Sequence, residues 1–91
     1  MKISSIVPAY NEERLLPAAL AQNEESSRVL IGRGWETELI VSDNNSTDHT
    51  AEIARANGAT VVFESVNQIS RARNRGAEAA TGDWLWFIDA D

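Results

Sequence analysis

Four short apolar segments, separated by stretches with a helical pattern, constrain the fold of this chain more than any other feature. The segments are residues 3–7, 38–42, 59–63 and 84–88. Strands that alternate with helices along a chain form a parallel sheet through right-handed crossovers. The segments also lack strict alternation of apolar and polar residues, as expected when helices cover both faces of a sheet. The sequence therefore predicts an α/β fold, Rossmann-like, with three α/β/α layers and a mainly parallel sheet.

The three intervening stretches carry residues that are typical of helix boundaries. Pro17 is suited to the first turn of the first helix. Asn45 or Ser46 is expected to cap the second helix, and Gly58 is expected to end it in the left-handed conformation. Ser70 is expected to cap the third helix. These boundaries place each helix between two strands, as the alternating order requires.

The composition excludes several classes of function. A chain of 91 residues allows one domain. Its net charge of −6 argues against nucleic acid as a partner, because nucleic-acid binding requires basic surface. It contains no cysteine, which excludes disulfides, thiolate zinc sites and a cysteine nucleophile. The expected location is the cytoplasm, with the cytoplasmic face of the membrane left open for a longer parent protein.

Polar residues gather at one predicted edge of the sheet. Ligands of open parallel sheets bind beyond the carboxyl ends of the strands, near the point where the strand order reverses. The first strand leads to Pro8, Ala9, Tyr10, Asn11 and Glu12, the second to Asp43, Asn44 and Asn45, and the last to Asp89, Ala90 and Asp91. The third helix starts near the same edge with Arg71, Arg73, Asn74 and Arg75. We therefore expect carboxylates, amides, guanidinium groups and an aromatic ring at one rim.

These residue types suit a nucleotide diphosphate that is bound together with a metal ion. Asp89 and Asp91, one residue apart at the end of an apolar strand, offer hard oxygen ligands to a divalent cation. Arginine binds phosphate oxygens through a bidentate fork. Arg71 and Arg75 share one side of a helix and Arg73 is rotated away from them, so the three cannot all face one pocket.

Several of these residues also have a purely structural interpretation. Asp43 can accept a hydrogen bond from a base N–H, but aspartate is also a common turn former. Tyr10 can pack against a base ring or only against the protein. Asp89 and Asp91 can serve to protect the exposed end of a strand from aggregation. Taken one at a time, the residues leave these alternatives open.

Taken together, four motifs in this order resemble the inverting glycosyltransferases of family 2, which have the GT-A fold. They are the opening strand and loop at residues 6–12, the acidic motif at 40–48, the Ala-Arg-Asn-x-Gly helix at 72–76 and the Asp-x-Asp motif at 87–91. The resemblance spans residues 1–91. It implies the nucleotide-sugar (donor) binding part of a GT-A domain, its N-terminal half, truncated after the Asp-x-Asp motif. One departure is Asn44-Asn45, where many members have Asp-Gly.

The resemblance implies a role for each residue of the rim. Pro8, Ala9, Tyr10 and Glu12 would line the nucleotide pocket, Asp43 would contact the base, Arg73 and Asn74 would lie near the diphosphate and sugar, Asp89 would face the ribose or sugar, and Asp91, together with Asp89, would bind Mn²⁺ or Mg²⁺. The implied activity is metal-assisted transfer of a sugar, with inversion, from a nucleotide-diphosphate sugar to an unidentified acceptor. A UDP-sugar is the expected donor, with GDP- and dTDP-sugars as alternatives.

In the family, the general base and the acceptor-binding half lie beyond the Asp-x-Asp motif. No catalytic residue is therefore expected within residues 1–91: the parent protein would be an enzyme, and the isolated chain an inactive nucleotide-binding module. The last strand is central in the family's sheet, so here it is expected to be an exposed apolar edge through which copies associate. Receiver and dinucleotide-binding domains are the other α/β candidates, but their acidic pair and their G-x-G-x-x-G turn are missing after the first strand.

Overall fold

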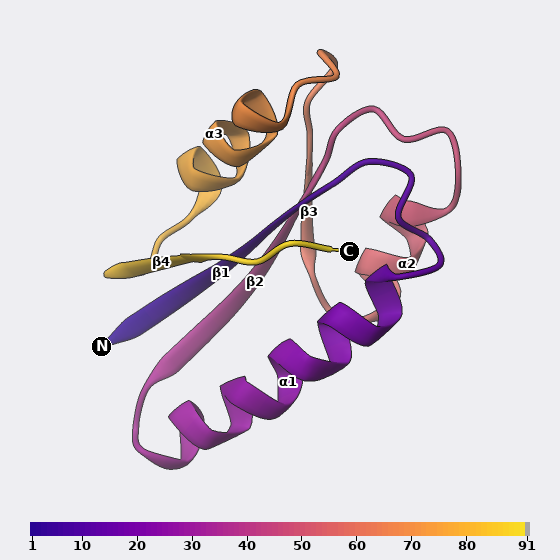
Figure 1. The fold of residues 1–91 in the computed structure, drawn as a ribbon. Helices are drawn as coiled ribbons and strands as arrows, with labels where there is room; N and C mark the ends of the chain where they lie inside the picture. The colour runs from indigo at the N-terminus through magenta and orange to yellow at the C-terminus, as the bar shows by residue number, and fades with distance from the viewer. Residues whose placement is uncertain (91) are drawn as a thin grey trace.

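The computed structural model describes residues 1–90, which form strands and helices in strict alternation (Figure 1). The elements are β1 (Lys2–Ala9), α1 (Leu16–Gly32), β2 (Glu36–Asp43), α2 (Thr50–Ala56), β3 (Thr60–Phe63), α3 (Ile69–Ala79) and β4 (Trp84–Phe87). All pairings between neighbouring strands are parallel. No helix within the described range has both the length and the apolar character of a membrane span.

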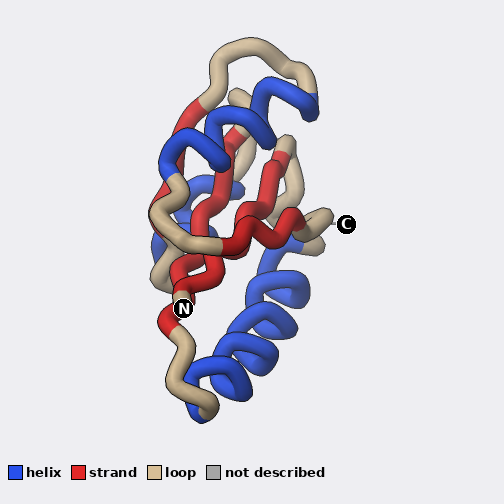
Figure 2. The backbone as a smooth tube through the Cα atoms, turned by 90° about the vertical axis from the view of Figure 1, so that its left-hand side faces the viewer, coloured by secondary structure: helices blue, strands red, loops and turns tan. Residues whose placement is uncertain are grey.

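The strand order β3-β2-β1-β4 explains how the helices are divided between the two faces of the sheet. The chain moves outward from β1 to β2 to β3 and then returns past β1 to reach β4. Because each crossover is right-handed, the reversal of direction places α3 on the face opposite to α1 and α2. Figures 1 and 2 show the sheet between these two layers. The predicted three-layer α/β/α arrangement is therefore confirmed.

The two faces of the sheet are packed in different ways. On the face that α1 and α2 cover, Val7 and Val41 pack with Leu16, Leu20 and Ala54 in one buried cluster. Burying such side chains stabilises a fold by roughly 1.5–3 kcal/mol each.

On the other face, α3 approaches the sheet closely because it presents Ala72 and Gly76, both of which are buried. A Cβ atom added at Gly76 would lie 2.5 Å from Cγ2 of Ile6, so the helix could not keep its place with a larger residue there. This contact sets the distance between α3 and β1.

Helix boundaries are where the sequence prediction and the structure differ. Pro17 in the first turn of α1 and Gly58 in the left-handed conformation after α2 are confirmed. The predicted caps of the other helices are wrong: α2 begins at Thr50 rather than after Asn45 or Ser46, and α3 begins at Ile69, before Ser70. Asn45 is itself left-handed, with φ of 62°, so the helix cannot start there. Oδ1 of Asp48 accepts the Thr50 N–H at 2.9 Å in the turn before α2, and the N-cap residue is His49.

A cluster of polar side chains holds together the amino-terminal ends of three strands of the sheet. The Ser4 hydroxyl donates to Oε2 of Glu38 at 2.5 Å, and the Thr81 N–H donates to the same oxygen at 2.7 Å. The Gly82 N–H donates to the Ser4 Oγ at 2.9 Å. Glu38 therefore joins β1, β2 and the turn between α3 and β4, and this joint sets where β4 enters the sheet.

The Glu38 cluster makes stability depend on pH. Burial raises the pKa of Glu38, but hydrogen bonds from Ser4 and Thr81 and the charge of Lys2 outweigh it, so the pKa lies below its usual value of 4.5. A lowered pKa contributes stability that is present above the unfolded-state pKa and is lost as the pH falls through the folded-state pKa. Between about pH 6 and about pH 3, we expect the wild type to lose more free energy of unfolding than Glu38→Gln. Urea denaturation at both pH values measures this, and equal losses would contradict the assignment.

Candidate functional site

The strand order reverses between β1 and β4, and the rim lies beyond the carboxyl ends of these strands (Figure 1). Pro8 and Ala9 are buried at the end of β1, so they support the rim mainly through their backbone. The carbonyl of Ala9 accepts the Asn44 N–H at 2.8 Å, which ties the ends of β1 and β2 together. Tyr10 is 49% exposed and is open to a ligand. Glu12 is partly buried, and its N–H is bonded at the start of α2.

The loops that follow β1 and β2 are cross-linked around Asp43. The Asn11 N–H donates to the Ser46 hydroxyl at 2.9 Å, and Oδ1 of Asn11 accepts the Thr47 N–H at 2.8 Å. Asp43 is buried, and its Oδ1 accepts the Ser46 N–H at 3.1 Å. The loop between β2 and α2 therefore sets the position of the Asp43 carboxylate.

Arg73 and Asp89 come together at the rim, although they lie on different elements. Nη2 of Arg73, in the second turn of α3, is 3.8 Å from Oδ1 of Asp89, which follows β4. Both side chains are well exposed, at 47% and 73%. An exposed pair at this distance contributes little to stability. Its importance is that it places a guanidinium group and a carboxylate side by side where strand order reverses.

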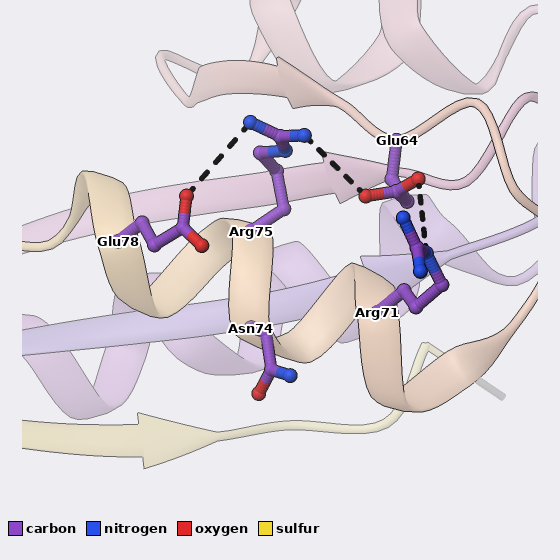
Figure 3. Close-up of a pocket in the computed structure, with 5 residues that line it drawn as sticks. All are labelled: Glu64, Arg71, Asn74, Arg75 and Glu78. Atoms are coloured by element: carbon purple, nitrogen blue, oxygen red, sulfur yellow. Dashed lines mark ion pairs between the residues drawn. The ribbon is translucent and has the colours of Figure 1, made fainter.

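Arg71 and Arg75 face a different partner, the buried carboxylate of Glu64. Nε of Arg71 and Nη2 of Arg75 each lie 3.5 Å from a Glu64 oxygen, and Figure 3 shows both guanidinium groups turned toward it. The Val66 N–H lowers the pKa of Glu64, and although burial opposes this, the two arginines lower it further. The prediction that Arg71 and Arg75 share one helix side and Arg73 another is confirmed. Glu64 was missed, although the strand-end argument applied to β3 would have found it.

The sequence placed Asn44 at the rim, but it did not predict that this residue anchors a loop. Its side chain is buried, and Nδ2 donates to the carbonyls of Val66 at 2.6 Å and Glu64 at 3.3 Å. Its Oδ1 accepts the Gln68 N–H at 3.0 Å, and its backbone carbonyl accepts Nδ2 of Asn67 at 2.6 Å. Asn44 therefore holds the whole loop between β3 and α3 against the end of β2.

Three of the predicted residues line separate pockets. Tyr10 belongs to one of ≈ 270 Å³, which it shares with residues 44 and 67–69. Asp89 lines a second of ≈ 210 Å³ beside α1. Asn74 lines a third of ≈ 230 Å³ with the Glu64 cluster, and its side chain points away from the ion pairs in Figure 3. Tyr10, Asn74 and Asp89 therefore line three different pockets.

Of the two carboxylates predicted to bind a metal ion, the structure describes that of Asp89. Asp91 lies outside the described residues. Within residues 1–90, no three histidine or acidic side chains come close enough together to hold a metal ion. The exposed carboxylate of Asp89 is the kind of hard oxygen ligand that Mn²⁺ and Mg²⁺ take. It would need further oxygen ligands to complete a site.

Comparison with known proteins identifies the family. Residues 4–91 match Glycosyl transferase family 2. An uncharacterized glycosyltransferase of Mycobacterium tuberculosis is 39% identical over 89 residues, which is 98% of this chain and 36% of that protein. The 4,4'-diaponeurosporenoate glycosyltransferase of Staphylococcus haemolyticus is 40% identical over 97 residues, covering 98% of this chain and 24% of the relative.

Solved structures show the same fold. Glucosyl-3-phosphoglycerate synthase from M. tuberculosis, in complex with Mn²⁺, UDP and phosphoglyceric acid, superposes with a TM-score of 0.78 at 35% identity. The match covers 99% of this chain and 33% of that one. The chain therefore spans about a third or less of the proteins it resembles. These glycosyltransferases have the GT-A fold, and the chain belongs to glycosyl transferase family 2.

Proposed function

We propose that this chain is the donor-binding part of a glycosyltransferase that uses a nucleotide-diphosphate sugar, most readily a UDP-sugar. The observation that carries the proposal is the Arg73–Asp89 pair, which lies where the strand order reverses and on the same rim as Asp43. Support also comes from the M. tuberculosis synthase, whose structure holds Mn²⁺, UDP and phosphoglyceric acid. In the present protein the acceptor is unidentified.

The residues of the rim have complementary tasks in this proposal. Tyr10 packs against the base, and Asp43 accepts a hydrogen bond from a base N–H. Arg73 binds diphosphate oxygens, which guanidinium groups do with favourable geometry. Asp89, together with Asp91, would hold Mn²⁺ or Mg²⁺. When bound, this cation neutralises the negative charge that develops on the departing nucleoside diphosphate.

The experiment that tests this function is calorimetric titration of the full-length protein with UDP, GDP and dTDP, with and without Mn²⁺. We expect UDP to bind most tightly and its affinity to depend on the metal. Failure of all three nucleotides to bind in the presence of Mn²⁺ would refute the proposal. Inversion is tested separately by proton NMR of the glycosylated product, whose anomeric configuration should be opposite to that of the donor.

A second candidate applies to the 91 residues in isolation: a module that binds nucleotide but transfers no sugar. The support for it is that the chain spans only about a third or less of the glycosyltransferases that it resembles. Sugar transfer by the purified 91-residue chain would overturn this candidate.

We also propose that the isolated chain self-associates through β4. This strand forms the edge of the sheet, and its side chains at residues 84–87 are between 42% and 57% exposed. An apolar edge with unpaired N–H and C=O groups is a template for pairing with another strand. Light scattering should show oligomers of the wild type and a monomer for Trp86→Lys. Val29→Lys, which changes an exposed apolar residue on α1, is the control and should still associate.

A further inference from the structure

The pocket that contains Tyr10 has a second wall, formed by the end of the β3–α3 loop and the first residue of α3. Asn67, Gln68 and Ile69 line this pocket of ≈ 270 Å³ together with Tyr10 and Asn44. Tyr10 and Ile69 are 49% and 55% exposed, so two large apolar side chains border a space that is open to solvent. A flat aromatic ligand can be held between such side chains, with polar groups along its rim.

This second wall is fixed before any ligand arrives. The Gln68 N–H donates to Oδ1 of Asn44 at 3.0 Å, and Nδ2 of Asn67 donates to the Asn44 carbonyl at 2.6 Å. Nδ2 of Asn44 in turn holds the carbonyl of Val66. Since Asn44 directly follows Asp43, the wall and the base-contacting aspartate are anchored to the same end of β2. A preorganised wall loses little conformational entropy when a ligand binds.

The amide side chains of this pocket differ in their hydrogen bonding, and that of Gln68 is exposed to solvent. The Asn67 amide is committed to Asn44 and Asn45. The side-chain amide of Gln68 has no hydrogen-bond partner in the part of the chain that the structure describes, although it lines the pocket. An amide carries both donors and an acceptor. It can therefore pair with the edge of a base that presents a carbonyl next to an N–H.

We infer that Gln68 determines the base specificity of the donor site, with Tyr10 and Ile69 on the two faces of the base. The inference rests on the proposed function and refines it. Nε2 of Gln68 donates to the C4 carbonyl of uracil, next to the N3–H whose hydrogen bond Asp43 accepts. Cytosine presents an amino group and an unprotonated nitrogen at this edge, so it offers neither partner.

The test is the affinity of full-length variants for UDP and CDP in the presence of Mn²⁺, since these nucleotides differ only at this edge. Gln68→Leu removes the amide and should reduce the preference for UDP over CDP by about tenfold, the factor that a loss of about 1.4 kcal/mol produces. Gln68→Glu keeps the shape but offers only an acceptor, so it should shift preference further toward CDP. Ser70→Ala, an exposed neighbour outside the pocket lining, is the control and should leave the ratio unchanged.

The outcomes separate this inference from the function on which it rests. If the wild type binds neither UDP nor CDP with Mn²⁺, the inference about Gln68 is wrong, and the proposed function fails as well only if GDP and dTDP also do not bind. If the wild type prefers UDP and both Gln68 variants keep the wild-type ratio, the donor site stands and the role of Gln68 is wrong. A change in ratio for Gln68→Leu and Gln68→Glu, but not for Ser70→Ala, establishes it.

Discussion

Asn44→Asp is expected to lower the free energy of unfolding by about 3 kcal/mol, the cost of leaving buried polar groups unpaired next to a charge. The side chain is 4% exposed, and its Nδ2 lies 2.6 Å from the Val66 carbonyl and 3.3 Å from the Glu64 carbonyl. Aspartate has nearly the same shape, but it would direct a carboxylate oxygen at two carbonyl oxygens. The bond from the Gln68 N–H would survive, so the loss reports on the two donor contacts.

Asn45→Asp is the matched control for this substitution. It makes the same chemical change one residue later, where the side chain is exposed and the Nδ2 contacts, to the Ser65 carbonyl and to Asn67, are 3.3 and 3.4 Å long. Aspartate also tolerates the left-handed backbone at this position. Urea denaturation of the two variants should show a loss below about 1 kcal/mol for Asn45→Asp. Equal losses would mean that Asn44 does not anchor the loop.

Asp89→Asn is expected to weaken the binding of UDP to the full-length protein by about 100-fold in the presence of Mn²⁺, or about 2.7 kcal/mol. The substitution keeps the size of the side chain and removes the charge that would hold the metal ion. The free energy of unfolding should change little in Asp89→Asn. The Asp89 side chain is exposed, and an exposed ion pair as long as its contact with Arg73 contributes little to stability.

Asp83→Asn provides the control, because Asp83 directly precedes β4 and therefore lies at the amino-terminal ends of the strands, opposite to the rim. Its Oδ2 accepts the Lys2 N–H at 2.9 Å, far from the rim in the fold. Titration with UDP should give wild-type affinity for this variant. An unchanged affinity for Asp89→Asn, or the same loss in both variants, would remove Asp89 from the proposed site.

The fold and part of the site could be predicted because they follow from periodic and topological rules. Alternating strands and helices with right-handed crossovers leave few arrangements, and strand ends then meet at one edge. This reasoning placed Arg73, on the third helix, and Asp89, after the last strand, at the same rim. Helical spacing alone separated Arg73 from Arg71 and Arg75.

The roles that were missed depend on contacts that no local pattern records. Asn44 and Glu64 are buried polar groups whose partners are backbone groups of a loop or side chains of a helix. The wrong cap of α2 has the same origin: Asn11, from a distant loop, bonds to Ser46 and Thr47 and holds them outside the helix. Long-range hydrogen bonds here outweigh the local capping preference.

Mn²⁺ binding to the full-length protein, followed by electron paramagnetic resonance with and without UDP, tests the central claim most directly. If the rim holds a metal ion and a diphosphate together, each must tighten the binding of the other by the same factor. After correction for Mn²⁺–UDP complexes in protein-free solution, we predict that UDP increases Mn²⁺ binding in the wild type and in Asp83→Asn but not in Asp89→Asn. Mn²⁺ binding that is indifferent to UDP in the wild type would contradict the account.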